Sequence, residues 1–163
     1  MQKILKHGFT LIELLVVISV IGILTALITT NFVEARNRAH DTRAKTNLAQ
    51  LKIALHSFYI NYQRYPETDI GVYLKGCGPT GIDRCTTSFT AGDVIYLDKL
   101  PKTGNFNDFF YYGCTDGDDF RVKVTLKNAS DADLAESQAN CPASSCGGVS
   151  PYGTLDYVVC GSQ

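Results

Sequence analysis

The feature that most constrains the fold is an apolar run near the start of the chain that merges into a helical pattern. Residues 9–28 are 20 positions with one formal charge, Glu13. As a helix they rise about 30 Å, the thickness of the hydrocarbon core of a bilayer. Because an acid inside such a run is unfavourable unless it has a specific partner, Glu13 is a candidate functional residue. The run predicts either a membrane-spanning helix or the apolar part of a secretory signal.

The helix is predicted to continue to about Tyr62, because residues 31–62 contain no Pro and no Gly. Apolar side chains recur there at spacings of three and four and share one face: Ala44, Leu48, Leu51, Leu55, Phe58 and Tyr62. We expect this face to pack on a folded region rather than to form a separate coiled coil. Basic side chains lie mostly off it, on a solvated face or paired with acids in a packed helical array: Arg36, Arg38, Arg43, Lys45 and Lys52.

The second half of the chain predicts a small antiparallel sheet packed against that helix. Apolar residues at 120, 122, 124 and 126 alternate with Arg121, Lys123 and Thr125, which is the period of a strand with one face buried. Residues 109–114 supply a hairpin partner through the turn at 115–118, and residues 155–159 suggest a third strand. Pro66 ends the helix, and a Gly-rich loop follows to about Gly92. The predicted fold class is therefore α+β.

All six cysteines lie in the second half of the chain. An even number in a loop-rich region indicates disulfides formed outside the cytosol, whereas zinc would call for Cys-x-x-Cys or paired His spacing. Of about 15 pairings that six cysteines allow, three pairs are favoured: Cys77–Cys85, Cys141–Cys146 and Cys114–Cys160. The first two close short loops, and the third ties the first strand to the last. Cys141–Cys160 is the main competitor.

Acidic residues form two groups. Asp116, Asp118 and Asp119 are candidate calcium ligands, since calcium takes several carboxylate oxygens, but a polar hairpin turn is the simpler interpretation. The second group favours a helix that begins near Ser130, because carboxylates stabilise a first turn: Asp131, Asp133 and Glu136. No cofactor is expected.

Enzymatic and nucleic-acid-binding functions are not indicated. The formal net charge is −1, so bulk charge does not favour nucleic acid. His7 precedes the apolar run, His40 and His56 lie about four helical turns apart, and the common nucleophile and phosphate-loop motifs are absent.

The segment Lys6-His7-Gly8 followed by FTLIELLVVISVIGIL resembles the N-terminal signal shared by type IV pilins and the pseudopilins of type II secretion systems. The shared pattern is a short basic leader ending in Gly, then Phe, then Glu four residues later inside an apolar helix. The resemblance implies that a membrane-embedded prepilin peptidase cuts between Gly8 and Phe9 and that the new amine is methylated. It also suggests that Glu13 pairs with the amine of Phe9 in a neighbouring subunit, which would set the axial register of a filament.

The resemblance also implies a division of the chain. We expect a leader at 1–8, a transmembrane and polymerisation helix at 9–30, an amphipathic helix at 31–62 and a disulfide-bonded extracellular head at 63–163, in a type IV pilin-like fold. The helix is weak between Gly22 and Thr30, where filaments of the family can lose helical structure, although Thr30 stands where a Pro is common. The segment YLDKLPKTGNFNDFFYY is similar to one in pilins and major pseudopilins but lacks the Asp-Pro-Trp-Gly core typical of the latter.

The expected function is that of a pilin that polymerises with copies of itself. Its partners would be the peptidase, an inner-membrane assembly platform and, before assembly, the membrane. It would start in the inner membrane with the head outside and end in an extracellular or periplasmic filament. One alternative is a major-type pseudopilin. An alternative from another class is a membrane-anchored extracellular binding module that does not polymerise.

Overall fold

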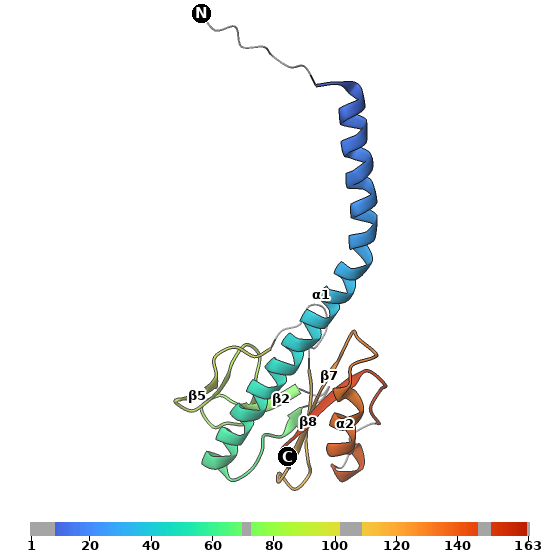
Figure 1. The fold of residues 1–163 in the computed structure, drawn as a ribbon. Coiled ribbons are helices and arrows are strands. Elements are labelled where there is room, and N and C mark those ends of the chain that lie inside the picture. The colour runs from blue at the N-terminus through green and yellow to red at the C-terminus, as the bar shows by residue number, and fades with distance from the viewer. Residues whose placement is uncertain (1–8, 70–72, 102–108, 147–150, 163) are drawn as a thin grey trace, which may run out of the picture. The chain divides into compact units, whose positions relative to one another are not determined.

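The computed structural model describes residues 9–69, 73–101, 109–146 and 151–162, and for residues 27–31, 69 and 145 it describes the backbone alone. The chain divides into two compact units, Met1–Asn37 and Arg38–Gln163. The first contains the start of the long helix α1, and the second, called the head below, contains the rest of α1 and all the strands (Figure 1).

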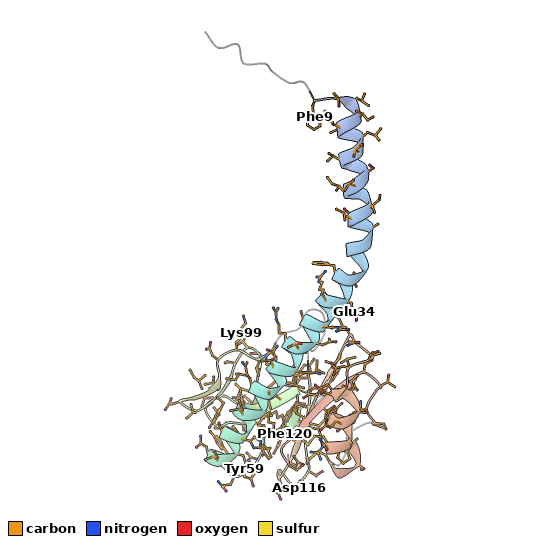
Figure 2. The ribbon with its side chains drawn as sticks, viewed as in Figure 1. Phe9, Glu34, Tyr59, Lys99, Asp116 and Phe120 are labelled. Carbon is orange, nitrogen blue, oxygen red and sulfur yellow. A yellow bond between two sulfur atoms is a disulfide. The ribbon has the colours of Figure 1, made fainter. Side chains whose placement is uncertain are left out.

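Helix α1 spans Leu11–Tyr62, 52 residues, and agrees with the predicted long helix. Its backbone is helical through Gly22 and Thr30, so the predicted helix-weak region is not melted here. Loss of helical structure on assembly stays a prediction, and the Thr30 side chain lies outside the described residues. In the first unit the described apolar side chains of α1 are exposed and project on both sides of the ribbon (Figure 2). In the part of the chain that the structure describes, no helix is both long and apolar enough to cross a membrane.

Within the head, α1 contributes the predicted apolar stripe to the core. Five of its residues are almost fully buried, namely Ala44, Leu48, Leu51, Leu55 and Phe58. Tyr62 is half-buried and stacks on Phe58 with ring centroids 4.3 Å apart. The helix ends at Tyr62 because Gln63 adopts a positive φ of 53°. Pro66 also disfavours helical geometry at the preceding residue, Tyr65.

The main sheet has three antiparallel strands in the order β6 (Phe110–Gly113), β7 (Phe120–Thr125) and β8 (Asp156–Cys160). The predicted hairpin is confirmed, since β6 pairs with β7 and the Cys114 N–H donates to the Asp119 carbonyl at 3.0 Å. The predicted third strand is confirmed by the pairing of β7 with β8. The α+β fold with a long N-terminal helix and a small antiparallel sheet is therefore present.

The Gly-rich segment after α1 is more structured than predicted. It forms β1 (Thr68–Asp69), β2 (Tyr73–Cys77) and β3 (Asp83–Arg84) in one small sheet. A separate hairpin follows, made of β4 (Phe89–Ala91) and β5 (Val94–Leu97). Its two-residue turn begins at Gly92, whose φ of 56° suits glycine and permits a tight connection. Strands this short give no alternation that a sequence pattern could detect.

One face of β7 differs from the prediction. Arg121, expected on an exposed face, is 1% exposed. Helix α2 (Asp133–Asn140) and the short 3-10 helix η1 (Ala143–Ser145) explain this burial, because the segment between them borders that face. The Arg121 guanidinium donates to the Asp119 carboxylate at 2.6 Å and to the Pro142 carbonyl at 3.4 Å. The buried charge is therefore paired and hydrogen-bonded. Helix α2 begins three residues after the predicted Ser130.

The three disulfides are Cys77–Cys85, Cys114–Cys146 and Cys141–Cys160. The first is the predicted pair, but the predictions of Cys141–Cys146 and Cys114–Cys160 are wrong, and the main competitor Cys141–Cys160 forms instead. The cause is the position of α2 along β8, where the Val158 N–H donates to the Ser137 hydroxyl at 3.3 Å. Cys141, at the end of α2, therefore packs beside Val158 and Cys160. The chain then turns through η1, which leaves Cys146 to pair with Cys114.

Candidate assembly site

The start of α1 is closed by reciprocal hydrogen bonds between Thr10 and Glu13. The Thr10 backbone N–H donates to Glu13 Oε2 at 2.9 Å, and the Thr10 hydroxyl donates to the same oxygen at 2.7 Å. In return, the Glu13 N–H donates to Thr10 Oγ1 at 3.3 Å. This is a capping box, in which the residue before the helix and the third helical residue satisfy each other's backbone groups.

Sequence reasoning did not identify Thr10, although the signature was present. The pattern Thr10-x-x-Glu13 directly before an apolar helix is the usual sequence mark of a capping box. Glu13 therefore has a role within its own chain, in addition to the predicted role between subunits. Phe9 is 75% exposed beside it, and Gly8, the other predicted processing residue, lies outside the described residues.

Further along α1, within the head, a buried carboxylate binds the helix to another segment of the chain. Asp41 is 1% exposed, and its two oxygens accept the backbone N–H groups of Lys127 at 2.9 Å and Asn128 at 2.8 Å. His40 Nδ1 lies 3.5 Å from Oδ1 of the same carboxylate. These bonds connect α1 to the loop that follows β7, so Asp41 determines where that loop meets the helix.

A second contact joins α1 to the segment that leads into α2. Lys45 Nζ lies 2.5 Å from Asp131 Oδ1 and 2.7 Å from Asp133 Oδ2. The hydrogen bond from Lys45 is the main reason that the pKa of the Asp131 carboxyl lies below its ordinary value. Among the five basic residues that the sequence places on α1, Lys45 is therefore paired, and its partners are acids of its own head. Arg36 and Arg43 are exposed.

The structure does not bring the three candidate calcium ligands together as one group. Asp116 and Asp118 are exposed, whereas Asp119 accepts hydrogen bonds from Arg121, from the Phe120 N–H at 2.8 Å and from the Gly161 N–H at 2.8 Å. The Asp119 carboxylate is therefore already used by its own chain. Among the described residues, no group of three or more His, Cys, Asp or Glu side chains is arranged to hold a metal ion.

The histidines of α1 serve packing. His56 Nδ1 lies 2.9 Å from the Tyr65 hydroxyl, and its ring meets the Phe120 ring edge-on at 6.1 Å. Burial, followed by the charge of Lys52, lowers the pKa of His56.

Comparison with known proteins locates the same N-terminal segment. The family model described as "Prokaryotic N-terminal methylation motif" matches residues 5–29, which include Gly8, Phe9 and Glu13. No solved structure matches the chain significantly.

Curated relatives match a larger part of the chain. Type II secretion system core protein G of Pseudomonas aeruginosa is 34% identical over 111 residues, 68% of this chain and 76% of that protein. The protein of the same name from Vibrio cholerae is 31% identical over 112 residues, 68% of this chain and 74% of that protein. Type IV major pilin protein PilA of Myxococcus xanthus is 45% identical over 62 residues, 38% of this chain and 28% of that protein. Because the match to core protein G extends over more than two thirds of both chains, this protein belongs to the type IV pilin and pseudopilin family.

Proposed function

We propose that this protein is a structural subunit that polymerises with copies of itself into a type IV pilus-like filament after residues 1–8 are removed. The observation that supports this most strongly is the methylation motif at residues 5–29, with Glu13 at the first turn of α1. The apolar side chains that the structure describes between Phe9 and Val33 support it as well, because they are exposed. Catalysis has no part in this proposal.

Residues 9–30 would lie in the inner membrane before assembly, with the leader inside and the head outside. The apolar run of 20 residues with one charge supports this placement in the membrane. The three disulfides support an oxidising compartment for the head. A prepilin peptidase would cut between Gly8 and Phe9, and an inner-membrane assembly platform would add the subunits to a filament in the periplasm or outside the cell.

A second candidate, the pseudopilin of a type II secretion system, is favoured by one observation. The aligned region covers 76% of core protein G from Pseudomonas aeruginosa but 28% of pilin PilA. Both candidates require polymerisation, and they differ in where the polymer ends. A pilus extends from the cell, whereas a pseudopilus stays short and remains with the cell envelope.

Shearing of cells that express the full chain, followed by blotting and electron microscopy, tests the proposal. A pilin is released as filaments into the sheared fraction. A pseudopilin stays with the membranes and can be cross-linked there into multimers. Mass spectrometry of either fraction should find Phe9 as the first residue. A chain that stays monomeric in both fractions would refute polymerisation and support the membrane-anchored binding module instead.

A further inference from the structure

Within the head, the outward face of α1 is apolar and is not covered by the residues that the structure describes. We define this outer face as Ala49, Ile53, Ser57 and Ile60, at spacings of four, four and three residues. Ile53 is 66% exposed and Ile60 is 72% exposed, which is unusual for large apolar side chains on a helix that faces a packed domain on its other side.

Burial of this face requires little loss of hydration from polar groups. The Ser57 hydroxyl already donates to the Ile53 carbonyl at 3.0 Å, so it offers no unsatisfied donor. Ala49 and the two isoleucines have no polar side-chain atoms. A partner that covers the outer face therefore gains apolar contact without breaking strong hydrogen bonds to water.

The head presents a second exposed apolar surface at the tip of the β4–β5 hairpin. Val94 is 46% exposed and Ile95 is 63% exposed, next to the turn at Gly92 and Asp93. Tyr96, the next residue, points the other way, because its hydroxyl accepts a hydrogen bond from Asn61 of α1 at 2.7 Å. This contact anchors the hairpin to α1 while Ile95 remains outside. Figure 1 shows β5 at the margin of the head, on the opposite side of α1 from α2.

The two surfaces have complementary charge. From Thr42 to Tyr62, α1 contains Arg43, Lys45 and Lys52 and no Asp or Glu. From Phe89 to Asp98, the hairpin contains Asp93 and Asp98 and no Lys or Arg. Exposed apolar side chains bordered by acids therefore lie on the hairpin. The two isoleucines of the outer face lie on the part of α1 from 42 to 62, where the only charged residues are Arg43, Lys52 and Lys45, the last of which is paired with Asp131 and Asp133.

From this complementarity we infer that the β4–β5 hairpin tip of one subunit docks on the outer face of α1 in a second copy of this chain. Each copy has both surfaces, so the contact is heterologous: it leaves one hairpin and one outer face free and can be repeated along an open helical polymer. The inference rests on the proposed function and names a contact between heads, separate from the pairing of Glu13 with a terminal amine.

Cysteine cross-linking in the full-length chain tests this contact. We place Ile60→Cys and Ile95→Cys together in one chain, oxidise assembled material and run it on a non-reducing gel. A heterologous contact produces a ladder of dimers, trimers and larger products. A mixture of the two single variants should stop at dimers, and each single variant alone should give none. The matched control combines Ile95→Cys with Ala135→Cys, an exposed position on α2, and should give no ladder.

Charge substitutions measure the importance of the same surfaces. Ile60→Lys or Ile95→Lys should lower the assembled fraction about tenfold, the equivalent of about 1.4 kcal/mol, whereas Ala135→Lys should leave it unchanged. All three positions are exposed, so the heads should fold, and an unchanged disulfide map verifies this. Normal assemblies that give no ladder, or dimers from Ile95→Cys alone, would overturn this contact and leave the proposed function standing. Failure of the wild-type chain to assemble would overturn both.

Discussion

The Glu13 carboxylate has one hydrogen-bond partner in the uncleaved chain, and we expect a different partner after assembly. In the uncleaved chain its carboxylate is hydrogen-bonded to the Thr10 N–H and hydroxyl. Cleavage before Phe9 creates an amine one residue from Thr10. An amine from a neighbour can pair with Glu13 only when the subunits have the correct axial stagger, and an unpaired charge between apolar helices is unfavourable. We therefore propose that the capping box holds Glu13 in place until such a neighbour binds.

We expect Glu13→Ala to leave processing and head folding intact but to reduce filaments sharply, and Glu13→Gln to be intermediate or equally poor. Electron microscopy and the yield of sheared protein measure this. The matched control is Thr10→Val, which removes the hydroxyl of the capping box and retains the carboxylate, and which should still assemble. Abundant, normally ordered filaments from correctly processed Glu13→Ala protein would contradict the pairing.

Asp41 should be important for stability rather than for assembly. Asp41→Ala leaves the Lys127 and Asn128 N–H groups without their acceptor, which costs about 3 kcal/mol in the free energy of unfolding. Asp41→Asn retains one acceptor oxygen and should cost less. Thermal unfolding of the full chain in detergent checks this order, with exposed Asp98→Ala as the control that stays near wild type. Equal unfolding temperatures for Asp41→Ala and Asp98→Ala would refute the role.

At the scale of elements, strong local periodicity made α1 and the main sheet predictable. The apolar spacing from Ala44 to Phe58 and the alternation in β7 each repeat over several residues, so the sequence pattern predicts which face is buried. The burial of Arg121 was not predictable, because it depends on α2 and Pro142, which are distant in sequence. The same packing of α2 on β8 determines the pairing of Cys141, and spacing along the chain does not reveal it.

The disulfide pairs of the structure lead to a prediction about elements. Proteolysis under non-reducing conditions should recover Cys114 linked to Cys146 and Cys141 linked to Cys160, the bond that joins the end of α2 to β8. The double variant Cys141→Ser, Cys160→Ser should lose about 3 kcal/mol of unfolding free energy, because a loop in the unfolded chain is no longer closed. Recovery of a peptide with Cys141 linked to Cys146 would contradict the observed position of α2.

At the scale of the whole head, three ion-paired carboxyls predict loss of stability in acid. Burial raises the pKa values of Asp119 and Asp156, but the ion pairs with Arg121 and Lys123, together with hydrogen bonds from backbone N–H groups, hold both below the ordinary value. The pKa of Asp131 is lowered chiefly by Lys45. The unfolded chain therefore binds more protons in acid than the folded head does, so stability is complete above about pH 5 and is lost as the pH falls through the folded pKa values. Unfolding temperatures at pH 6, 4 and 3 should fall in that order, and a constant value would refute these pairs.

The two units of the chain differ in what they bury. Every buried residue of the described chain lies at Asp41 or beyond, whereas the large apolar side chains that the structure describes between Phe9 and Val33 are exposed. The head therefore has its own core, closed by three disulfides.

We expect a chain of residues 38–163, exported to an oxidising compartment, to fold by itself with the same three disulfides. Its unfolding temperature should lie within about 5 °C of that of the full chain, because every core residue lies within residues 38–163 and a change of about 1 kcal/mol shifts a domain of this size by only a few degrees. It should not polymerise, since Phe9 and Glu13 are absent. Aggregation or scrambled disulfides in this fragment would show that the head needs the first unit. Filaments from the fragment would show instead that head contacts suffice for polymerisation and that the N-terminal half of α1 is dispensable.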